Sequence, residues 1–208
     1  ACLRGVCLRG ANFRVEKRVY EGADLRGVDL RGADLQGANL AGVDLRQANL
    51  SHANLQETNL REANLEGSNL QEANLKGTFL SDANLSQTTL TNAILIDAKL
   101  ERANLVEAVI KAVNLSSANL TDAKLSKTNL SYANLSGARL NRADLTRANL
   151  SHANLSDANL IEAYLARTNL TSANLTRANL AKAELSTANL TYAELEGATM
   201  PDGRVYEN

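Results

Sequence analysis

The chain has 208 residues and a formal net charge of −1, because its 22 basic and 23 acidic side chains nearly balance. That balance argues against a nucleic-acid partner, since such partners are bound by a surplus of basic residues. Aromatic residues make up only 3% of the sequence and tryptophan is absent, so the core must be narrow and filled by a recurring aliphatic side chain.

No apolar run approaches the length of a membrane span, so we expect no direct membrane contact from this segment. The sequence begins with Ala-Cys-Leu-Arg-Gly, already inside a repeat, and not with methionine. We therefore expect a domain of a longer polypeptide, whose upstream part could carry a membrane anchor. The compartment stays open between the cytoplasm and a membrane reached through that upstream part.

Residues 1–22 form the first unit of the predicted organisation. Three apolar residues lie five apart: Leu3, Leu8 and Phe13. Twelve residues then separate Phe13 from Leu25, which is two more than a multiple of five. We expect an N-terminal partial coil whose register is broken directly after Phe13, with Val15 and Tyr20 as degraded centres. The break is either a corner bulge or a protruding loop.

The two cysteines, Cys2 and Cys7, occupy equivalent positions of the first two repeats. Side chains diverge across a corner, so a disulfide between them needs local distortion. Two interpretations stay open: free thiols, or a disulfide that staples the first end. A pair of cysteines without further cysteine or histidine partners is a weak zinc signal.

Residues 23–202 repeat every five positions without interruption. The centre is Leu from Leu25 to Leu195, apart from Ile110, and Met200 is the last of 36 consecutive centres. Ala usually stands two residues before the centre and Asn or Asp one residue before it, which gives the consensus Ala-(Asn/Asp)-Leu-x-x.

A period of five fits neither an α-helix of 3.6 residues per turn nor a strand of period two. It fits a chain that turns a corner every five residues, with Ala and Leu pointing inward and the other positions facing out. Four corners close a square coil, which then consists of four repeats. Successive coils stack about 4.8 Å apart, so that each residue lies above its equivalent four repeats earlier. The pattern predicts an all-β solenoid of about nine to ten coils.

The pattern resembles the pentapeptide-repeat family over residues 21–202. The resemblance implies a right-handed quadrilateral β-helix with four repeats per coil. It also implies a cyanobacterial setting, where most members have no established biochemical function. The repeat number and style further resemble the repeat tail of a cyanobacterial membrane protein needed to deposit the heterocyst glycolipid layer.

The corners of the predicted coil change in composition along the chain. The second residue after the centre is mainly Gly up to Gly77 and mainly polar or charged beyond it. Type II turns need a positive φ at this position, which favours Gly. We therefore expect type II corners near the first end and mostly type I-like corners beyond Gly77.

Residues 203–208 are predicted to form a C-terminal cap or tail. Pro-Asp-Gly at 201–203 favours a tight turn, and Gly203, Arg204 and Val205 keep the repeat phase for one more side. We expect this segment to cover the last leucine layer, since solenoids need covered ends. No comparable cap begins the sequence, so end-to-end self-association through the first end is expected.

No catalytic, cofactor-binding or metal-binding residues are predicted. The only histidines, His52 and His152, are five coils apart and cannot share a metal. The sequence contains no phosphate-binding glycine motif and no arrangement of a nucleophile, a base and an acid.

The stacking of equivalent positions lets the outer surface be read as columns. One corner column brings together Tyr132, His152 and Tyr192, which are candidate partner-binding residues. Apolar residues in outward positions near the middle of the rod give further candidates: Phe79, Ile94, Ile96 and Val109. A third column stacks Lys127, Arg147 and Arg167, either as a solvated basic edge or as a site for an acidic partner.

These features predict a non-catalytic structural or protein–protein interaction module whose protein partner is unknown. The alternative is a DNA mimic that binds gyrase, as some members of the family do. Those members are strongly acidic, whereas Asp24, Asp29 and Asp44 here alternate with Arg26, Arg31 and Arg46. A regular Ser and Thr surface for ice or carbohydrate is a weaker possibility.

Overall fold

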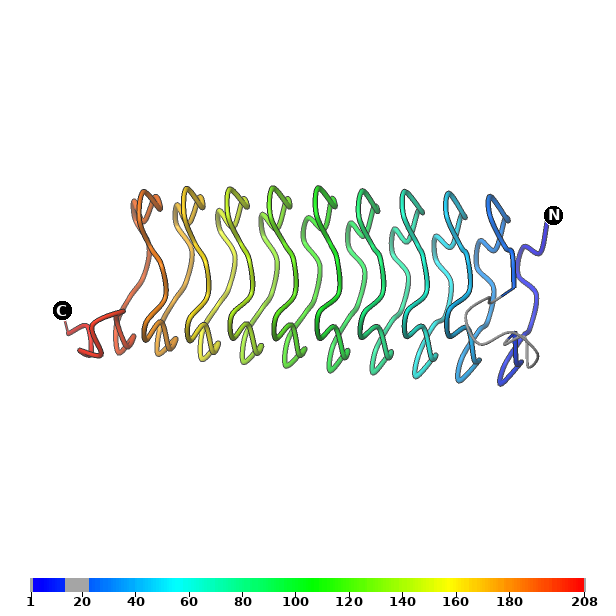
Figure 1. Ribbon diagram of the computed structural model, residues 1–208, viewed down its shortest axis with the longest axis horizontal. Coiled ribbons are helices and arrows are strands. Elements are labelled where there is room, and N and C mark those ends of the chain that lie inside the picture. The colour runs from blue at the N-terminus through cyan, green and yellow to red at the C-terminus, as the bar shows by residue number, and fades with distance from the viewer. Residues whose placement is uncertain (1, 14–22, 208) are drawn as a thin grey trace.

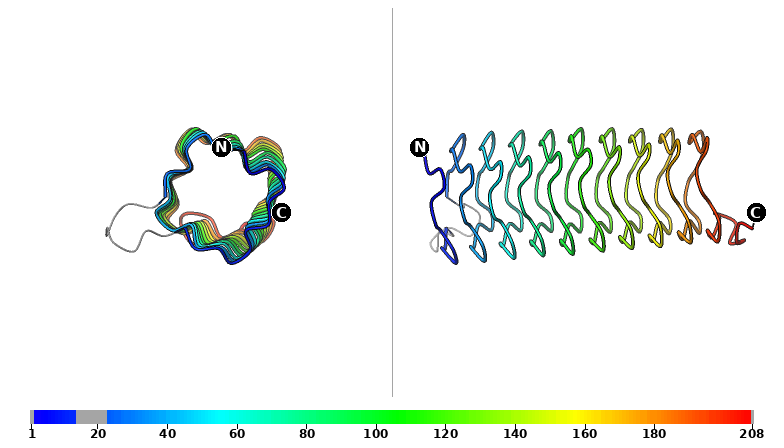
Figure 2. Two further views of the ribbon diagram at one scale, coloured as in Figure 1. Left: turned by 90° about the vertical axis from the view of Figure 1, so that its right-hand side faces the viewer. Right: turned by 180° about the vertical axis from the view of Figure 1, so that it is seen from behind.

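The chain winds into a right-handed, four-sided β-helix (Figure 1). The computed structural model describes residues 2–13 and 23–207. Viewed along the rod axis, the coils superpose in one closed outline, and the two termini lie at opposite ends of the rod (Figure 2). The predicted fold class is confirmed.

The sides of the coil pair through single parallel bridges, and the described residues form no helix and no longer strand. Each bridge joins the residue before a centre to its equivalent one coil later, as between Asp44 and Asn64. The bridges continue with this constant offset from Asp24↔Asp44 to Asn179↔Thr199.

Three backbone hydrogen bonds on each side hold neighbouring coils together. The amide of Leu30 donates to the carbonyl of Asn49 over 2.7 Å, and the amide of Asn49 donates back to the carbonyl of Val28 over 2.9 Å. A third bond joins the corner residue of one coil to the next coil, from Gly32 to Ser51 over 2.9 Å. Backbone groups that would otherwise be buried unpaired are satisfied in this way.

The core is a stack of leucine and alanine layers. The leucine centres from Leu30 to Leu180, with Ile110 among them, are at most 1% exposed. Threonine replaces alanine at several inward positions, and its hydroxyl then needs a partner. Thr58, for example, donates its hydroxyl to the carbonyl of Leu35 over 2.8 Å.

The first coil is longer than a regular coil. Cys2, Cys7 and Asn12 pair with residues 27 positions later, at Asp29, Asp34 and Asn39. The chain between Phe13 and Ala23 therefore holds seven residues more than a regular coil needs. The expected count of two extra residues was wrong by one whole repeat, because sequence spacing gives only the remainder after division by five. Val15 and Tyr20 lie outside the described residues.

The corner prediction was wrong beyond Gly77. At all 27 corner residues other than glycine from Gln47 to Tyr192, 22 of them beyond Gly77, φ lies between 53° and 61°, which is the sign that type II turns require. The reason is the hydrogen bond between corners, such as that from Gln47 to the carbonyl of Glu66 over 3.0 Å. A corner of another type would break this bond with both neighbouring coils, and the bonds offset the strain of a positive φ.

The C-terminal segment is a β-hairpin and does not add another side to the coil. Asp202 lacks the positive φ of the earlier corners, and Gly203 takes it one residue later with φ of 85°. The chain therefore reverses, and Val205 pairs antiparallel with Thr199. This is the type I turn with a glycine bulge that three-residue hairpin loops favour. The prediction that Gly203 continues the five-residue repeat for one more side was therefore wrong.

The corner geometry predicts opposite effects of two glycine exchanges. Ala112→Gly should raise the free energy of unfolding by roughly 1 kcal/mol, because Ala112 has φ of 53° and a left-handed residue other than glycine is strained. Gly37→Ala should lower the free energy of unfolding by a similar amount, because the alanine would be strained at the positive φ of this corner. No atom lies within 4 Å of the added methyl group, so no clash adds to this cost. Urea unfolding measures both values, and equal stabilities would contradict this account of the corners.

One buried hydroxyl gives a second stability prediction. The Ser68 side-chain oxygen is buried and has no hydrogen-bond partner among the described residues. Ser68→Ala should therefore raise the free energy of unfolding by about 1 kcal/mol. The control is Thr78→Val, which removes a hydroxyl that donates to the carbonyl of Leu55 over 2.8 Å and should be destabilising. Urea unfolding in which Ser68→Ala loses stability would refute the prediction.

Candidate functional site

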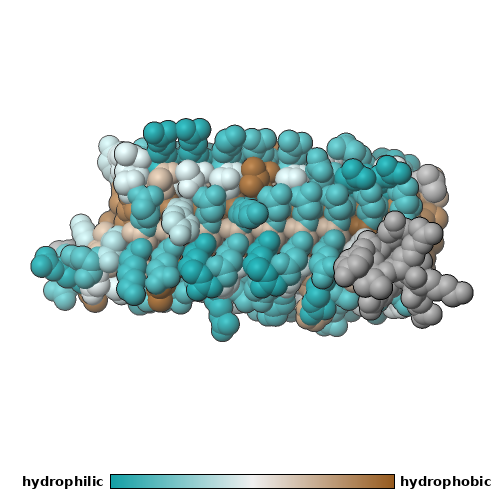
Figure 3. All heavy atoms as spheres, viewed as in Figure 1, coloured by the Kyte–Doolittle hydropathy of each residue, from teal (hydrophilic) through white to brown (hydrophobic). Residues whose placement is uncertain are grey.

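Most charged side chains on the rod are neutralised by a neighbour. In the first coils an arginine follows two residues after an aspartate, and the two side chains pair, as Arg31 does with Asp29 over 2.7 Å. Further along, pairs form between coils, as between Arg102 and Asp82 over 2.6 Å. The face shown in Figure 3 is accordingly mostly hydrophilic, and apolar atoms are scattered over it.

These pairs shift the acidities of their carboxyl groups. The hydrogen-bonded guanidinium of Arg26 lowers the pKa of Asp24 to about 2, and Arg31 does the same for Asp29. Hydrogen bonds from arginine also lower the pKa of Asp82 and of Asp122. Asp24 and Asp82 are exposed, and Asp29 and Asp122 are half-buried, so each pair fixes charge positions and adds modestly to stability.

The aromatic edge is the corner that carries Tyr132, His152 and Tyr192. The rings of Tyr132 and His152 are stacked, with centroids 4.8 Å apart and planes 9° from parallel. The ammonium group of Lys111 lies 5.7 Å from the centroid of the Tyr132 ring. Tyr132 is 55% exposed and Tyr192 is 84% exposed. The structure thus brings these three residues onto one edge, as the column reading indicated.

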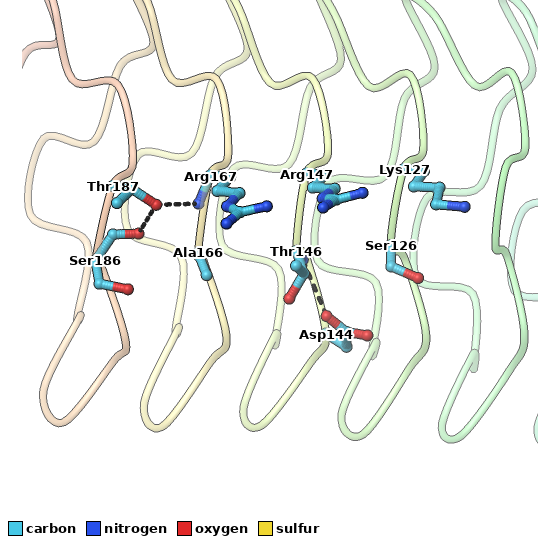
Figure 4. Close-up of a pocket in the computed structure, with 9 residues that line it drawn as sticks. All are labelled: Ser126, Lys127, Asp144, Thr146, Arg147, Ala166, Arg167, Ser186 and Thr187. Carbon is cyan, nitrogen blue, oxygen red and sulfur yellow. Dashed lines mark hydrogen bonds between the residues drawn. The ribbon is translucent and has the colours of Figure 1, made fainter.

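The basic edge is the neighbouring corner that carries Lys127, Arg147 and Arg167. The three side chains project from successive coils beside an open groove of about 620 Å³ (Figure 4). Lys127 pairs with Glu107 over 3.0 Å. Among the described residues, Arg147 and Arg167 form no ion pair.

One flat side of the rod separates the two edges, and its polar groups bond to one another. Asn169 donates its side-chain amide to the oxygen of Asn149 over 3.2 Å. The hydroxyl of Thr171 donates to the side-chain oxygen of Asn169 over 2.6 Å. The asparagine ladder therefore has its hydrogen-bonding capacity largely used within the rod. Such a side offers a partner a regular, rigid surface.

The mid-rod apolar candidates do not gather in one patch. Phe79 is half-buried, with the guanidinium of Arg61 4.4 Å from its ring centroid. Ile94 and Val109 are exposed at 39% and 42%, and Ile96 is half-buried. They lie on three sides of the coil: Val109 and Ile94 flank the aromatic edge on its two sides, whereas Phe79 and Ile96 lie farther round the coil. The contact between Arg61 and Phe79 was missed from sequence, although the two positions are almost one coil apart and so lie close together on adjacent coils.

The histidines and the cysteines form neither a metal site nor a disulfide among the described residues. His52 lies five coils away from His152. Its imidazole lies 3.3 Å from a carboxylate oxygen of Glu72. In the described ranges no group of three potential ligands could hold a metal ion. Cys2 and Cys7 are free and exposed thiols, so the structure does not contain the disulfide that was left open. Across residues 2–13 and 23–207, no helix is long and apolar enough to cross a membrane.

Comparison with known proteins identifies the class. The family model of pentapeptide repeats matches in eight copies between residues 21 and 202. The chain belongs to this family, as the resemblance predicted. No curated protein matches the sequence significantly.

Two solved structures share the fold. HetL is a pentapeptide repeat protein involved in heterocyst differentiation regulation from the cyanobacterium Nostoc sp. strain PCC 7120. It is 37% identical, with 92% of this chain and 94% of HetL covered and a TM-score of 0.56. QnrB1, a plasmid-mediated fluoroquinolone resistance protein, is 18% identical, with 91% of this chain and 90% of QnrB1 covered and a TM-score of 0.54. At this identity QnrB1 shows the fold alone.

The arginine pairs predict loss of stability in acid. The folded-state pKa of Asp24 and Asp29 is about 2, below the ordinary value of 3.8. Their contribution is therefore present above about pH 4 and is lost as the pH falls towards about 2. The melting temperature of the wild type should fall more steeply across this window than that of Asp24→Asn/Asp29→Asn. Parallel melting curves against pH for the two proteins would count against the pairs.

Proposed function

We propose that the chain is a rigid, non-catalytic rod that binds another protein through the aromatic edge and the flat side beside it. The observation that carries the proposal is the exposure of Tyr192 and Tyr132 on one corner, with the His152 ring stacked on that of Tyr132. Tyrosine combines a large apolar ring with a polar tip, which makes it a frequent anchor at protein interfaces.

The order of the surrounding surface supports binding. The flat side is held by asparagine ladders such as Asn129, Asn149 and Asn169, so it changes little when a partner docks. A partner that meets a preorganised surface loses less conformational entropy than one that must order it. Val109 lies on this flat side, in the column of Asn129, and adds an exposed apolar contact next to the N-terminal end of the aromatic edge.

The biological setting is proposed from the similarity to HetL. That protein is described as involved in heterocyst differentiation regulation and shares 37% identity over nearly its whole length with this chain. We therefore place the rod in heterocyst formation in a cyanobacterium, where it would hold a protein of that process. If the rod is the repeat tail of a membrane protein that deposits the heterocyst glycolipid layer, its role also belongs to heterocyst formation.

A DNA-mimicking role at gyrase finds no support in the charge distribution. The net charge is −1, and acidic residues such as Asp29 and Asp44 are held by arginines. A duplex mimic needs an uncompensated row of negative charge. The surface of this rod instead alternates both signs.

The proposal predicts a partner that depends on the aromatic edge. Wild-type rod should capture a specific protein from a lysate of a heterocyst-forming cyanobacterium, and a variant with Tyr132, His152 and Tyr192 changed to Ser should lose it. Removing a hot-spot aromatic residue typically costs about 2 kcal/mol or more of binding free energy. We therefore expect at least a tenfold weaker interaction, measured by titrating the purified pair.

The matched control is Tyr164→Ser, which removes a tyrosine that is also exposed but lies on a different side of the rod. It should capture the partner as well as the wild type does. Equal capture by all three proteins would move the site away from the aromatic edge. Failure of the wild-type rod to capture any specific protein would contradict the binding function itself.

A further inference from the structure

The corner arginines of the rod fall into two groups. Three of them have an aspartate one coil earlier in the same column and grip it through two hydrogen bonds: Arg102 with Asp82, Arg142 with Asp122, and Arg177 with Asp157. Arg147 and Arg167 occupy the same kind of corner, but their predecessors in the column are Lys127 and Arg147. The position one coil before each of these two arginines in the column therefore carries a cation and not a carboxylate.

This column is the exception among the corners. No other corner column of the described residues stacks three like charges in succession. Coils lie about 4.8 Å apart, so neighbouring cations repel each other at close range. An anion placed beside them would relieve the repulsion, and Arg147 and Arg167 have no internal partner to give up.

The groove beside the basic edge offers hydroxyl hydrogen-bond donors in addition to its cationic side chains. Hydroxyl groups of Ser126, Thr146 and Ser186 line it together with the three cations (Figure 4). The one carboxylate in the lining, Asp144, accepts the backbone amide of Thr146 over 2.9 Å. The charged side chains that line the groove thus comprise three cations and one anion, with hydroxyl donors between the coils.

We propose that an acidic helix of the partner protein lies along the basic edge, parallel to the rod axis, with carboxylates facing Lys127, Arg147 and Arg167. This inference rests on the proposed protein-binding function and names the chemistry of the partner. The flat side between the basic and aromatic edges belongs to both surfaces, so one partner can contact both.

The spacing favours a helix over an extended segment. Three stacked cations span about 9.6 Å, which is two coil spacings. Carboxylates at positions i, i+4 and i+7 of a helix span about 10.5 Å along its axis. Alternate residues of an extended strand are about 6.6 Å apart and would span about 13 Å over three side chains, so they would fall out of register with the cations.

The test measures binding of two synthetic acidic peptides to the purified rod. Both form helices and have the same composition, but one carries its glutamates in a single stripe at i, i+4, i+7 and i+11, and the other spreads them around the helix. Fluorescence anisotropy is recorded at about 150 mM salt, where charges beyond about 8 Å are screened. The striped peptide should bind the wild type at least fivefold more tightly, because only its carboxylates can all face one edge.

Two variants locate the site. Arg147→Asp places a carboxylate one coil before Arg167, as Asp157 stands before Arg177, and should weaken binding of the striped peptide about tenfold by removing one cation and occupying another. Lys76→Asp changes the net charge equally at an exposed position on another side and should leave binding within twofold. Circular dichroism melting checks that both variants stay folded.

Equal binding of the two peptides, or equal binding to Arg147→Asp and the wild type, would overturn the inference. Binding of duplex DNA with the same sensitivity to Arg147→Asp would also overturn it, in favour of a general polyanion site. These outcomes are distinct from failure of the proposed function. A partner captured through Tyr132 and Tyr192 while the striped peptide does not bind would remove only the acidic helix.

Discussion

The rest of the structure depends on the backbone hydrogen bonds between coils. On every side the amide of a centre such as Leu50 reaches a carbonyl of the next coil, here that of Asn69, over 2.7 Å. Because a similar bond recurs at the corners, each corner must copy the geometry of its neighbours. That requirement imposes a positive φ on lysine, tyrosine and glutamate residues alike, although such residues seldom adopt it.

The same stacking turns sequence separation into surface chemistry. Two side chains one coil apart in the sequence become neighbours about 4.8 Å apart along the rod, so their pairing is decided by which residues occupy one column. Asp122 and Arg142 form an ion pair, whereas Tyr132 and His152 form a ring stack. Arg147 and Arg167, with a lysine before them in the column, are left for an external partner. The surface chemistry of this rod is therefore set at intervals of one coil, on a core that is nearly the same throughout.

Sequence periodicity predicted the features that recur in every repeat and failed where the chain departs from it. The inward leucine and alanine positions and the aromatic edge followed from the coil of four repeats. The corner type did not, because the propensity of a single residue such as Arg102 against a positive φ is outweighed by bonds to two neighbouring coils. The length of the first insertion and the reversal at Gly203 did not either, since each depends on pairing with a distant segment.

The most direct test of this stacking is disulfide formation between introduced cysteines, in a chain with Cys2 and Cys7 replaced by serine. Asp97 and Ser117 lie in one corner column, so cysteines there should be about 4.8 Å apart at their Cα atoms, within the range that a disulfide spans. Mild oxidation followed by mass spectrometry should show a bond between positions 97 and 117. The control pair, Cys at 97 and 112, is closer in sequence but on different corners and should stay reduced. A bond in the control pair, or none between 97 and 117, would contradict the coil of four repeats.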